Sequence, residues 1–475
     1  MPFEDLRSFI RRVEEIGDLK TVRGAHWNLE IGCMAELMAE RKGPALLFDE
    51  VVDYPAGYRV FVNAFTTVRR TALLFDLPLS YKGLDIVKAL RERHRVFKPM
   101  PPKEVSDGPV FENKHYGDEV NLYEFPTPRW REFDGGRYIG TGCVCVMRDP
   151  DEGWVNAGTY RVMIHDGKTA GLYISPGHDG AIIMQKYHMQ HRSCPIAVSL
   201  GQDPHLYYAS MTPIGWGVSE YDYAGWLRGE PVKVVRGPLT DLPIPATSEI
   251  VLEGEVPPPD VELREEGPFG EWTGYYGGER IPRPVIRVKA VYHRNDPILF
   301  GNPHFKPPTP SSIAIPHYAA NIWDQLEAAG VPDVKGVWVL SFTEASPIIV
   351  VAIKQRYGGH AKQAGHIAAC CKAGGYANRL VIVVDEDVDI TNAEDVLWAV
   401  VTRSDFKNID LISEGWSSRL DTSVPPEKRE IGDLTNTRLV INACRPHHRK
   451  DFPVVNRSSE ELRSKILSKF SHLFD

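Results

Sequence analysis

The chain has 475 residues, of which 43% are hydrophobic and 25% charged, and its formal net charge is −8. This balance is typical of a globular protein with several domains, and the acidic net charge argues against general nucleic-acid binding. No apolar run is long enough to span a membrane, and the charged N-terminus is unlike a secretory signal. Seven scattered cysteines without a CxxC pair argue against a disulfide framework or a structural zinc site. We therefore expect a cytoplasmic protein without a membrane span.

The first 112 residues alternate helical and strand patterns. Apolar residues recur at helical spacing from Phe3 to Ile16, and a second helical pattern covers 29–41. Further patterns predict strands at 44–48 and 59–63 and a helix through 72–74. This alternation predicts a small N-terminal α/β domain over residues 1–112.

Closely spaced strand patterns fill residues 113–312. Two short helical patterns, at about 181–190 and 219–228, interrupt them. The predicted strands cover 140–147, 155–166, 169–175, 195–200, 232–236, 250–256 and 285–292. This spacing predicts a β-rich, barrel-like central domain. It contains neither a complete dinucleotide-binding glycine motif nor a Walker A loop.

The α/β alternation returns in residues 313–475. Buried strands are predicted at 337–341, 348–353 and 380–384, with a small-residue helix over 358–371 and another helix over 392–402. The last residues, 460–474, form an amphipathic pattern that could pack on this chain or on a neighbouring subunit. We expect a C-terminal α/β domain that also mediates homo-oligomerisation, giving a dimer or a larger assembly.

The most informative stretch is an acidic bend in the predicted central domain. Glu266 and Glu271 flank Gly267-Pro-Phe-Gly270, and glycine and proline favour a rigid turn. Residues five apart point to opposite faces of a straight strand, but a bend can bring both carboxylates into one pocket. Paired carboxylates beside a cation can have different pKa values, so that one acts as an acid and the other as a base. The alternative is an ordinary Pro/Gly turn with two solvated glutamates.

Three other local patterns accompany this bend. Asn156 to Arg161 places an amide and a guanidinium on one predicted strand, His178 lies in a glycine-flanked loop, and Glu220 opens a predicted helix. Each has an ordinary alternative. Asn156 and Arg161 could be surface residues, His178 an isolated loop histidine, and Glu220 a favourable first-turn acid.

Together these segments resemble the UbiD family of decarboxylases, and the resemblance covers nearly the whole chain. It rests on 156–161, 219–229, 266–276 and 359–362, with supporting matches at 199–204, 249–254 and 399–403. The resemblance implies an α/β multidomain fold with an N-terminal α/β domain, a central flavin-reductase-like split β-barrel and a C-terminal α/β domain with a terminal helix. It also implies prenylated FMN, supplied by a flavin prenyltransferase, together with Mn²⁺ or Mg²⁺ and K⁺.

The resemblance assigns metal-binding and cofactor-binding residues. Asn156, His178 and Glu220 are expected to bind the metal, and His188 and His191 remain alternatives to His178. Oxygen donors suit Mn²⁺ or Mg²⁺. The expected cofactor contacts are Thr159, Tyr160, Arg161, Tyr173, Ile174, Ser175 and Lys362.

Arg161, Glu266 and Glu271 match the family's catalytic residues. Arg161 provides a planar cation. Glu271 is expected to donate the proton, and Glu266 is expected to adjust the acidity of that proton. We therefore expect reversible, non-oxidative decarboxylation of an aromatic, heteroaromatic or α,β-unsaturated carboxylic acid by a carboxy-lyase. The alternatives are a non-catalytic assembly subunit and a reductase that uses unmodified FMN. His304 and Lys306 could line the substrate pocket or belong to an ordinary Pro-rich loop.

Overall fold

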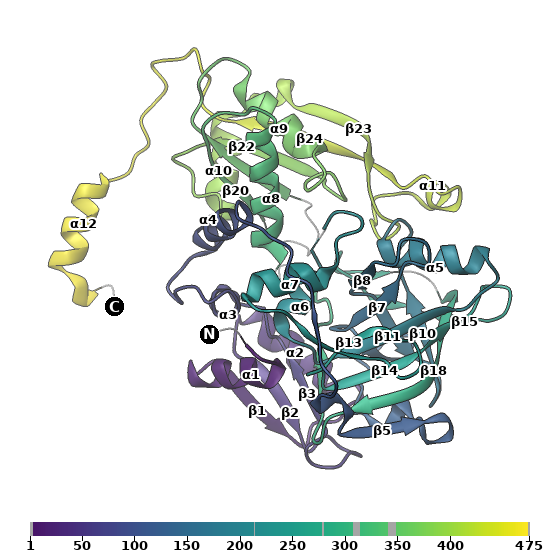
Figure 1. Cartoon of the computed structure of the whole chain (residues 1–475). Coiled ribbons are helices and arrows are strands. Elements are labelled where there is room, and N and C mark those ends of the chain that lie inside the picture. Colours follow the sequence, from purple (N-terminus) through teal and green to yellow (C-terminus); the bar gives the residue numbers. More distant parts are fainter. Residues whose placement is uncertain (1–2, 213, 278–279, 307–313, 341–347, 474–475) are drawn as a thin grey trace.

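The computed structural model describes residues 3–212, 214–277, 280–306, 314–340 and 348–473. Its strands form sheets of four, ten and five strands and two smaller sheets. In Figure 1 the N-terminal segment lies at the lower left, the ten-stranded sheet beside it, and the C-terminal sheet above both. The expected α/β multidomain fold is confirmed. The expected domain limits at 112/113 and 312/313 remain predictions.

The N-terminal sheet has the order β1-β2-β3-β19. Its strands are β1 (Leu19–Arg23), β2 (Ala45–Asp49), β3 (Arg59–Val62) and β19 (Ile298–Gly301), and its helices are α1 (Leu6–Glu15), α2 (Glu30–Glu40) and α3 (Val68–Leu74). Asp5 precedes helix α1, and its side chain accepts from the Ser8 amide, as expected of an N-cap. Strand β19 pairs in parallel with β3, so the chain returns to this sheet after building the central one.

The ten-stranded sheet follows the order β6-β9-β10-β18-β14-β11-β7-β8, and both β5 and β15 also pair with β18. Its strands are β5 (Asn113–Tyr116), β6 (Arg137–Gly140), β7 (Val144–Arg148), β8 (Val155–Gly158), β9 (Arg161–Ile164), β10 (Thr169–Tyr173), β11 (Cys194–Leu200), β14 (Ile250–Val256), β15 (Leu263–Glu266) and β18 (Ile281–His293). Buried side chains such as Val162, Val198 and Leu252 form one core cluster inside it.

The prediction of a single strand over 155–166 is wrong. The chain leaves β8, which pairs with β7, and enters β9, which pairs with β6 and β10. Between them the Thr159 amide donates to the carbonyl of Ser210 at 3.4 Å instead of to a strand. The apolar residues change phase here, from Val155 and Ala157 to Val162 and Ile164, and the prediction overlooked that change.

Helices and short strands surround the central sheet. The helices are α5 (Asp179–Met189), α6 (Pro204–Ser210) and α7 (Glu220–Arg228), and the short strands are β4 (Lys103–Glu104), β12 (Lys233–Arg236), β13 (Pro243–Pro245), β16 (Phe269–Gly270) and β17 (Tyr276–Gly277). Short 3-10 helices precede the central strands β6 to β18 at η1 (Pro109–Phe111), η2 (Gly117–Glu119) and η3 (Leu122–Glu124). Two more lie in the C-terminal part of the chain, at η4 (Phe406–Asn408) and η5 (Ser471–Leu473). Helix α7 begins after Ser219, whose hydroxyl accepts from the Tyr221 amide.

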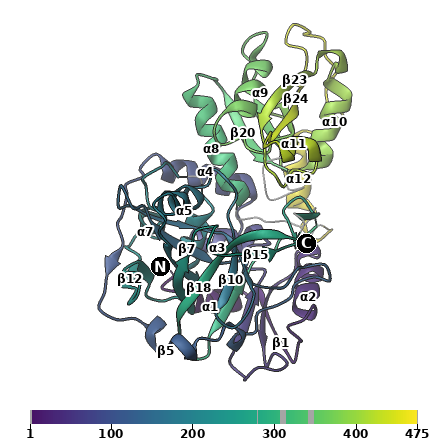
Figure 2. The ribbon, with the colours of Figure 1, turned by 90° about the vertical axis from the view of Figure 1, so that its right-hand side faces the viewer.

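The C-terminal sheet has the order β20-β21-β22-β24-β23. Its strands are β20 (Val334–Val339), β21 (Ile348–Ile353), β22 (Leu380–Asp385), β23 (Asp410–Trp416) and β24 (Thr435–Ala443), and its helices are α8 (Ala314–Ala328), α9 (His360–Cys370), α10 (Ala393–Arg403) and α11 (Pro426–Glu430). Asn392 caps α10, as an N-cap would, by accepting from two backbone amides. Helix α4 (Gly83–His94) lies beside α8 in Figures 1 and 2, so it joins the N-terminal segment to the C-terminal one.

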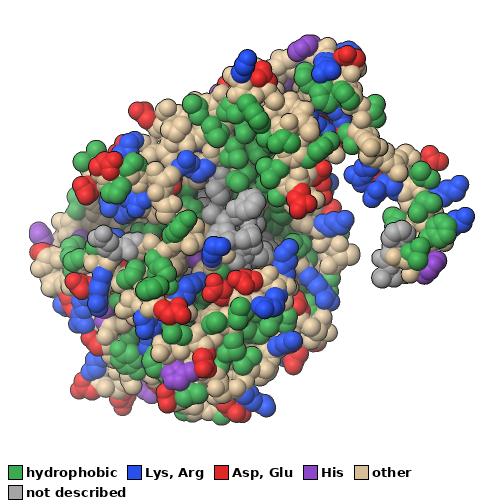
Figure 3. All heavy atoms as spheres, turned by 180° about the vertical axis from the view of Figure 1, so that it is seen from behind, with side chains coloured by type: hydrophobic (Ala, Val, Ile, Leu, Met, Phe, Trp, Pro, Cys, Tyr) green, Lys and Arg blue, Asp and Glu red, His purple; other side chains and the backbone are tan. Residues whose placement is uncertain are grey.

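The last helix, α12 (Glu460–Lys469), stands clear of the rest of the chain (Figures 1 and 3). None of its residues is buried, and Leu462, Ile466 and Leu467 are exposed. The predicted docking of this helix on a neighbouring subunit stays a prediction. Among the described residues, no helix is both long and apolar enough to cross a membrane.

Candidate active site

The acidic bend forms between β15 and β16. Gly267 has a φ of +91°, a conformation that glycine adopts readily. The bend packs against Gly135, whose amide donates to the carbonyl of Pro268 at 2.8 Å. A Cβ atom at Gly135 would lie 2.0 Å from the carbonyl oxygen of Gly267. Close backbone packing therefore fixes the bend that separates Glu266 from Glu271.

Arg161, at the start of β9, binds both carboxylates of the bend. Its Nε and Nη2 donate to the two oxygens of Glu266, each at 2.8 Å, and its Nη1 donates to Oε1 of Glu271. Glu266 Oε1 also accepts from the hydroxyl of Tyr138 at 3.0 Å. The structure therefore brings the three predicted catalytic residues together, and the reading of the bend as a turn with two solvated glutamates is wrong.

This cluster is enclosed by aromatic rings. The side chains of Arg161, Glu266 and Glu271 are 9%, 2% and 7% exposed. The guanidinium of Arg161 lies 4.5 Å from the ring centre of Tyr173 and 5.2 Å from that of Phe269. Burial alone would lower the pKa of Arg161, but the two carboxylates raise it above its ordinary value. The arginine is thus a fixed cation.

A cavity of about 180 Å³ opens beside Glu271. It is lined by Glu36, Arg131, Gly270, Glu271, Gly274, Tyr275, Tyr276, His304, Phe305 and Lys306. His304 and Lys306 therefore lie beside a cavity, and their contact with the substrate stays a prediction. The sequence reasoning missed Arg131, whose guanidinium lies 5.3 Å from the ring centre of Phe305. Both of its terminal nitrogens are buried without a hydrogen-bond partner among the described residues.

The predicted metal residues Asn156 and Glu220 lie in contact. Asn156 Nδ2 donates to Oε1 of Glu220 at 3.0 Å, and the Ala157 amide donates to Oε2 at 2.7 Å. Glu220 is 6% exposed, and burial raises its pKa to about 7. None of the ion pairs between described residues includes it. A buried carboxylate with neutral donors, beside an amide oxygen, suits a hard divalent cation, so these residues fit the expected metal.

Tyr160 connects this pair to His178. Its hydroxyl donates to Oδ1 of Asn156 at 3.1 Å and accepts from the Gly180 amide at 3.0 Å, and its ring is 6.4 Å from the ring of His178. Burial lowers the pKa of His178, which favours the neutral imidazole that metals bind.

The two alternative histidines lie at the other end of α5. His188 contacts the carbonyl of Val256 through Nε2 at 3.2 Å, and His191 follows the helix at an exposed position. A helix rises about 1.5 Å per residue, so ten residues place His188 roughly 15 Å from His178. This arrangement favours His178 over His188 and His191.

The predicted cofactor residues divide into two groups. Tyr173 ends β10 directly opposite Arg161, and Ile174 and Ser175 continue from it. Thr159 and Tyr160 occupy the break between β8 and β9. These residues border the arginine cluster and the Asn156–Glu220 pair. They therefore form a continuous series of candidate cofactor contacts between the carboxylates and the candidate metal residues.

Lys362 does not join them. It lies on α9 and forms an ion pair of 2.8 Å with Asp410. A second lysine, Lys372, follows the same helix. Burial raises the pKa of Asp179, beside His178, and the charges of His178 and Lys372 oppose that rise. Lys372, which the sequence reasoning missed, therefore lies near Asp179, next to the candidate metal residue His178.

The C-terminal segment also reaches the arginine cluster. Burial raises the pKa of Tyr376, a hydrogen bond to Ser418 opposes that rise, and the nearby Glu271 carboxylate adds to it. A Cβ atom at Gly277 would meet both Glu271 and Leu420, at 2.3 and 2.7 Å. The candidate site thus lies between the central and C-terminal sheets. Sequence reasoning had no signal for these contacts, because the residues lie more than 100 positions from the acidic bend.

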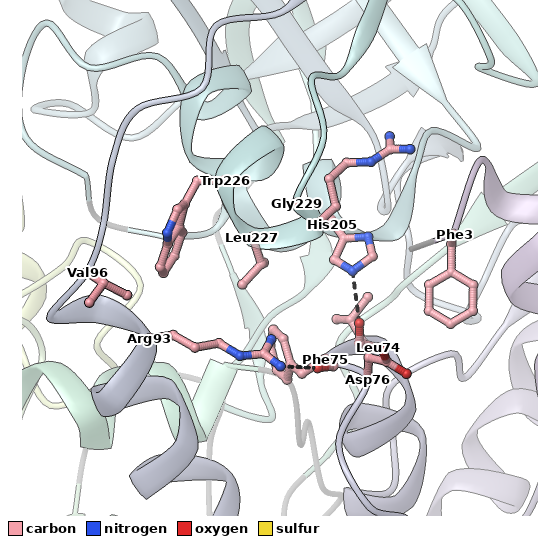
Figure 4. Close-up of a pocket in the computed structure, with 11 residues that line it drawn as sticks. Phe3, Leu74, Phe75, Asp76, Arg93, Val96, His205, Trp226, Leu227 and Gly229 are labelled. Carbon is pink, nitrogen blue, oxygen red and sulfur yellow. Dashed lines mark hydrogen bonds between the residues drawn. The ribbon is translucent and has the colours of Figure 1, made fainter. Parts of the chain in front are cut away.

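A larger cavity, of about 240 Å³, lies away from these residues (Figure 4). It is lined by Phe3, Leu74, Phe75, Asp76, Arg93, Val96, His205, Trp226, Leu227, Arg228 and Gly229. Two of the polar groups in view are already bonded: His205 to the Leu74 carbonyl at 2.9 Å and Arg93 to the Phe75 carbonyl at 2.7 Å. It contains no predicted catalytic residue, so the smaller cavity beside Glu271 is the candidate substrate site.

Three family models of 3-octaprenyl-4-hydroxybenzoate carboxy-lyase match successive parts of the chain. The N-terminal domain model matches residues 10–90, the Rift-related domain model 103–306, and the C-terminal domain model 312–443. The chain belongs to the UbiD family. The resemblance based on sequence motifs and the assignment to the carboxy-lyases are therefore confirmed.

Relatives of this UbiD protein include two decarboxylases. It is 34% identical over 412 residues to a phenolic acid decarboxylase of Bacillus subtilis (strain 168), covering 85% of each chain. It is 36% identical over 420 residues to a pyrrole-2-carboxylic acid decarboxylase of Pseudomonas aeruginosa, covering 84% of this chain and 83% of the relative. Aromatic and heteroaromatic acids thus appear among the relatives' named substrates.

Solved UbiD structures have the same fold. The open form of vanillic acid decarboxylase from Sedimentibacter hydroxybenzoicus superposes with a TM-score of 0.86 at 28% identity, covering 100% of this chain and 99% of the other. An evolved dimeric form of the UbiD-class enzyme HmfF from Pelotomaculum thermopropionicum, in complex with prenylated FMN, gives a TM-score of 0.83 at 26% identity, covering 98% and 100%. UbiD-class enzymes of this fold therefore bind prenylated FMN.

Proposed function

We propose that this UbiD protein catalyses non-oxidative, reversible decarboxylation of an aromatic, heteroaromatic or α,β-unsaturated carboxylic acid with prenylated FMN. The observation that supports this most strongly is the buried Arg161, which binds Glu266 through two nitrogens and Glu271 through a third. A passive scaffold gains little from such a cluster, because replacing buried ion pairs with apolar residues is often neutral or stabilising. A cavity beside Glu271 gives the cluster access to a small molecule.

The two carboxylates have different surroundings and therefore different proposed roles. Glu266 accepts three hydrogen bonds, two from Arg161 and one from Tyr138, so both of its oxygens are engaged inside the cluster. Glu271 lines the cavity. Glu266 is therefore the residue that positions Arg161, and Glu271, which reaches the cavity, is the proton donor.

Prenylated FMN, when bound, supplies the electron sink that allows loss of CO2. Arg161 has five N–H donors, and its contacts with Glu266 and Glu271 use three of them. The remaining two orient the substrate carboxylate. Glu271 carries the proton on Oε2, the oxygen that does not accept from Arg161, and delivers it to the carbon that CO2 leaves. In the carboxylation direction, Glu271 takes that proton back.

Asn156, His178 and Glu220 would hold a divalent metal, Mn²⁺ or Mg²⁺, and that metal would supply positive charge for the cofactor phosphate. The support is the buried, cation-free Glu220 among neutral donors. The proposed cofactor contacts are Thr159, Tyr160, Arg161, Tyr173, Ile174 and Ser175, and Lys372 adds a cation near Asp179. Lys362 and K⁺ stay predictions from the family resemblance, as does supply of the cofactor by a flavin prenyltransferase.

The cavity suggests an acid that carries a second polar or anionic substituent. Arg131 presents buried nitrogens without hydrogen-bond partners among the described residues, and the cavity also contains the rings of Tyr275, Tyr276 and Phe305. An aromatic ring can stack on these residues, and a carboxylate or phenolate can accept from both nitrogens of an arginine.

Protein produced with and without a flavin prenyltransferase tests the function. We expect CO2 release from aromatic acids only when the prenyltransferase is present and the bound flavin has the absorption of the prenylated form. A reductase would retain unmodified FMN and consume reducing equivalents. A non-catalytic subunit would release no CO2 from any aromatic, heteroaromatic or α,β-unsaturated acid tested, despite full loading with prenylated FMN. That result would contradict the proposal.

A further inference from the structure

A cluster of two histidines and one glutamate lies at the far end of the central sheet. His115, Glu124 and His293 each offer one ligand atom, and these atoms all lie within 4.8 Å of one another. The cluster is far from the catalytic residues. Glu266 pairs with Ile281 at one end of β18, whereas His293 is the last residue of that strand. Twelve residues of strand span roughly 40 Å.

Strand register brings the two histidines to one face. His115 on β5 lies opposite Val291 on β18, and residues two apart on a strand share a face. The side chains of His115 and His293 therefore lie diagonally across the pair, with rings stacked at 5.4 Å. Glu124, at the end of η3, contributes the third group from a separate loop.

Two of the three distances between ligand atoms match a tetrahedral ion. Nε2 of His115 is 3.3 Å from Nε2 of His293, which is 3.4 Å from Oε1 of Glu124. Ligand atoms that bind Zn²⁺ at about 2.0–2.1 Å in tetrahedral geometry lie about 3.3–3.4 Å apart. Adjacent ligands of an octahedral ion with similar bonds would lie closer, at about 3.0 Å.

Neighbouring groups orient the ligand atoms as outer-shell partners do in metal sites. The Nδ1 of His293 is 2.8 Å from the carbonyl of Arg294, so Nδ1 carries a hydrogen and Nε2 faces the cluster. Oε1 of Glu124 accepts from the hydroxyl of Tyr58 at 3.2 Å. His293 is buried, while His115 and Glu124 are half-buried, which leaves a solvent-facing side for a fourth ligand.

We propose that His115, Glu124 and His293 form a Zn²⁺ site with three protein ligands and one water. The site contains no cysteine, so the absence of CxxC pairs does not exclude it. It connects β5, η3 and β18, and Tyr58, which lies next to β3, extends the connection to the N-terminal sheet. Its role is structural, because it joins two sheets far from the catalytic cluster.

The test uses the full chain with Glu220→Ala, which removes the separate candidate metal site. Metal-free protein is titrated with Co²⁺, whose visible absorption is stronger in tetrahedral than in octahedral sites, and the Co²⁺ is then displaced by Zn²⁺. We expect one Co²⁺ per chain with tetrahedral absorption. Zn²⁺ should also raise the midpoint of thermal unfolding.

Three further changes in that background locate the site. His115→Gln and Glu124→Gln should abolish the tetrahedral absorption and the thermal shift, whereas His448→Gln, at an exposed histidine, should change neither. Tyr58→Phe should weaken binding by about 10–100-fold, as expected for an outer-shell partner.

Without an ion, the same contacts would form a hydrogen-bonded network in which a protonated His293 donates to Glu124. In that case the folded Glu220→Ala protein would show neither tetrahedral Co²⁺ absorption nor a Zn²⁺-dependent thermal shift. Either that result, or full binding in His115→Gln, would overturn the proposal. The first outcome needs no change in the cluster, so it remains decisive if the cluster variants fail to fold.

Discussion

Arg161 and Glu266 meet through two parallel hydrogen bonds of 2.8 Å, although 105 residues separate them in the chain. Both side chains are nearly excluded from solvent. Removing one partner of a buried ion pair typically costs about 3–5 kcal/mol, because the other charge stays buried and uncompensated. Removal of either partner should therefore destabilise the fold, even though an apolar pair of the same size could be as stable.

The first prediction concerns the stability of this pair. Glu266→Ala should lower the free energy of unfolding by about 3–5 kcal/mol, measured by denaturant titration. The matched control is Glu104→Ala, because Glu104 pairs with Arg236 at 3.0 Å but both side chains are about 60% exposed. Such surface pairs typically contribute at most about 1 kcal/mol. Equal losses in the two variants would show that burial of Arg161 and Glu266 has no energetic consequence.

The second prediction concerns the candidate metal residues. Glu220→Ala and His178→Ala should each lower bound Mn²⁺ and bound flavin together, measured by elemental analysis and absorption. Asp222→Asn, on the same helix as Glu220, should change neither. His188→Ala and His191→Ala should also retain both, because His188 lies at the other end of α5 and His191 beyond it. Normal metal and flavin content in a folded Glu220→Ala protein would remove Glu220 from the site.

The third prediction concerns Arg131. Arg131→Met should raise the KM for acids that carry a second anionic group by about 10–100-fold, since a hydrogen bond to a charged group contributes roughly 1.5–3 kcal/mol. The KM for an acid without such a group should change little. Arg129→Met, on the same loop, is the control. A uniform loss of kcat for all acids would instead indicate that Arg131 supports the fold of the bend.

The fourth prediction concerns stability in acid. His317 on α8 is buried, and burial together with the nearby charge of His94 lowers its pKa to about 3. Between the unfolded value of about 6.5 and pH 3, the unfolded chain therefore binds a proton that the folded chain does not. Stability should fall as the pH drops through this range, by at most about 1.4 kcal/mol per pH unit from this group.

Denaturant titrations of His317→Gln between pH 7 and 4 test this effect. The variant should lose less stability across that range than the unchanged chain, because glutamine does not titrate. His448→Gln, at an exposed position, should keep the original dependence. Parallel curves for His317→Gln and the unchanged chain would exclude His317 as a source of acid sensitivity.

Local sequence features predicted much of the fold and the centre of the site. The acidic bend was predictable because glycine and proline specify a turn over a few residues, and α10 because Asn392 is a good cap. The break at Thr159 was missed, although the apolar residues change there from odd to even positions. The choice between Lys362 and Lys372 depends on how the end of α9 lies relative to α5, which local sequence does not specify.

Other features depend on pairings between distant segments. Strand β19 joins β3 across more than 230 residues, and His115 meets His293 across 178. Arg131 enters the cavity because the bend packs against the loop that follows it, at Gly135. Nothing in the residues next to these positions indicates the contact, so sequence periodicity could not have predicted them.

The central claim is that Glu271 donates the proton, and turnover per bound prenylated flavin in Glu271→Gln tests it most directly. Glutamine preserves size and shape but is a very poor acid, and loss of a positioned acid typically costs about 10²–10⁴ in rate. We expect turnover to fall by about 10²-fold or more with normal flavin content, and Glu271→Asp to recover part of it. Near-normal turnover in Glu271→Gln would contradict the account and leave Glu266 as the candidate acid.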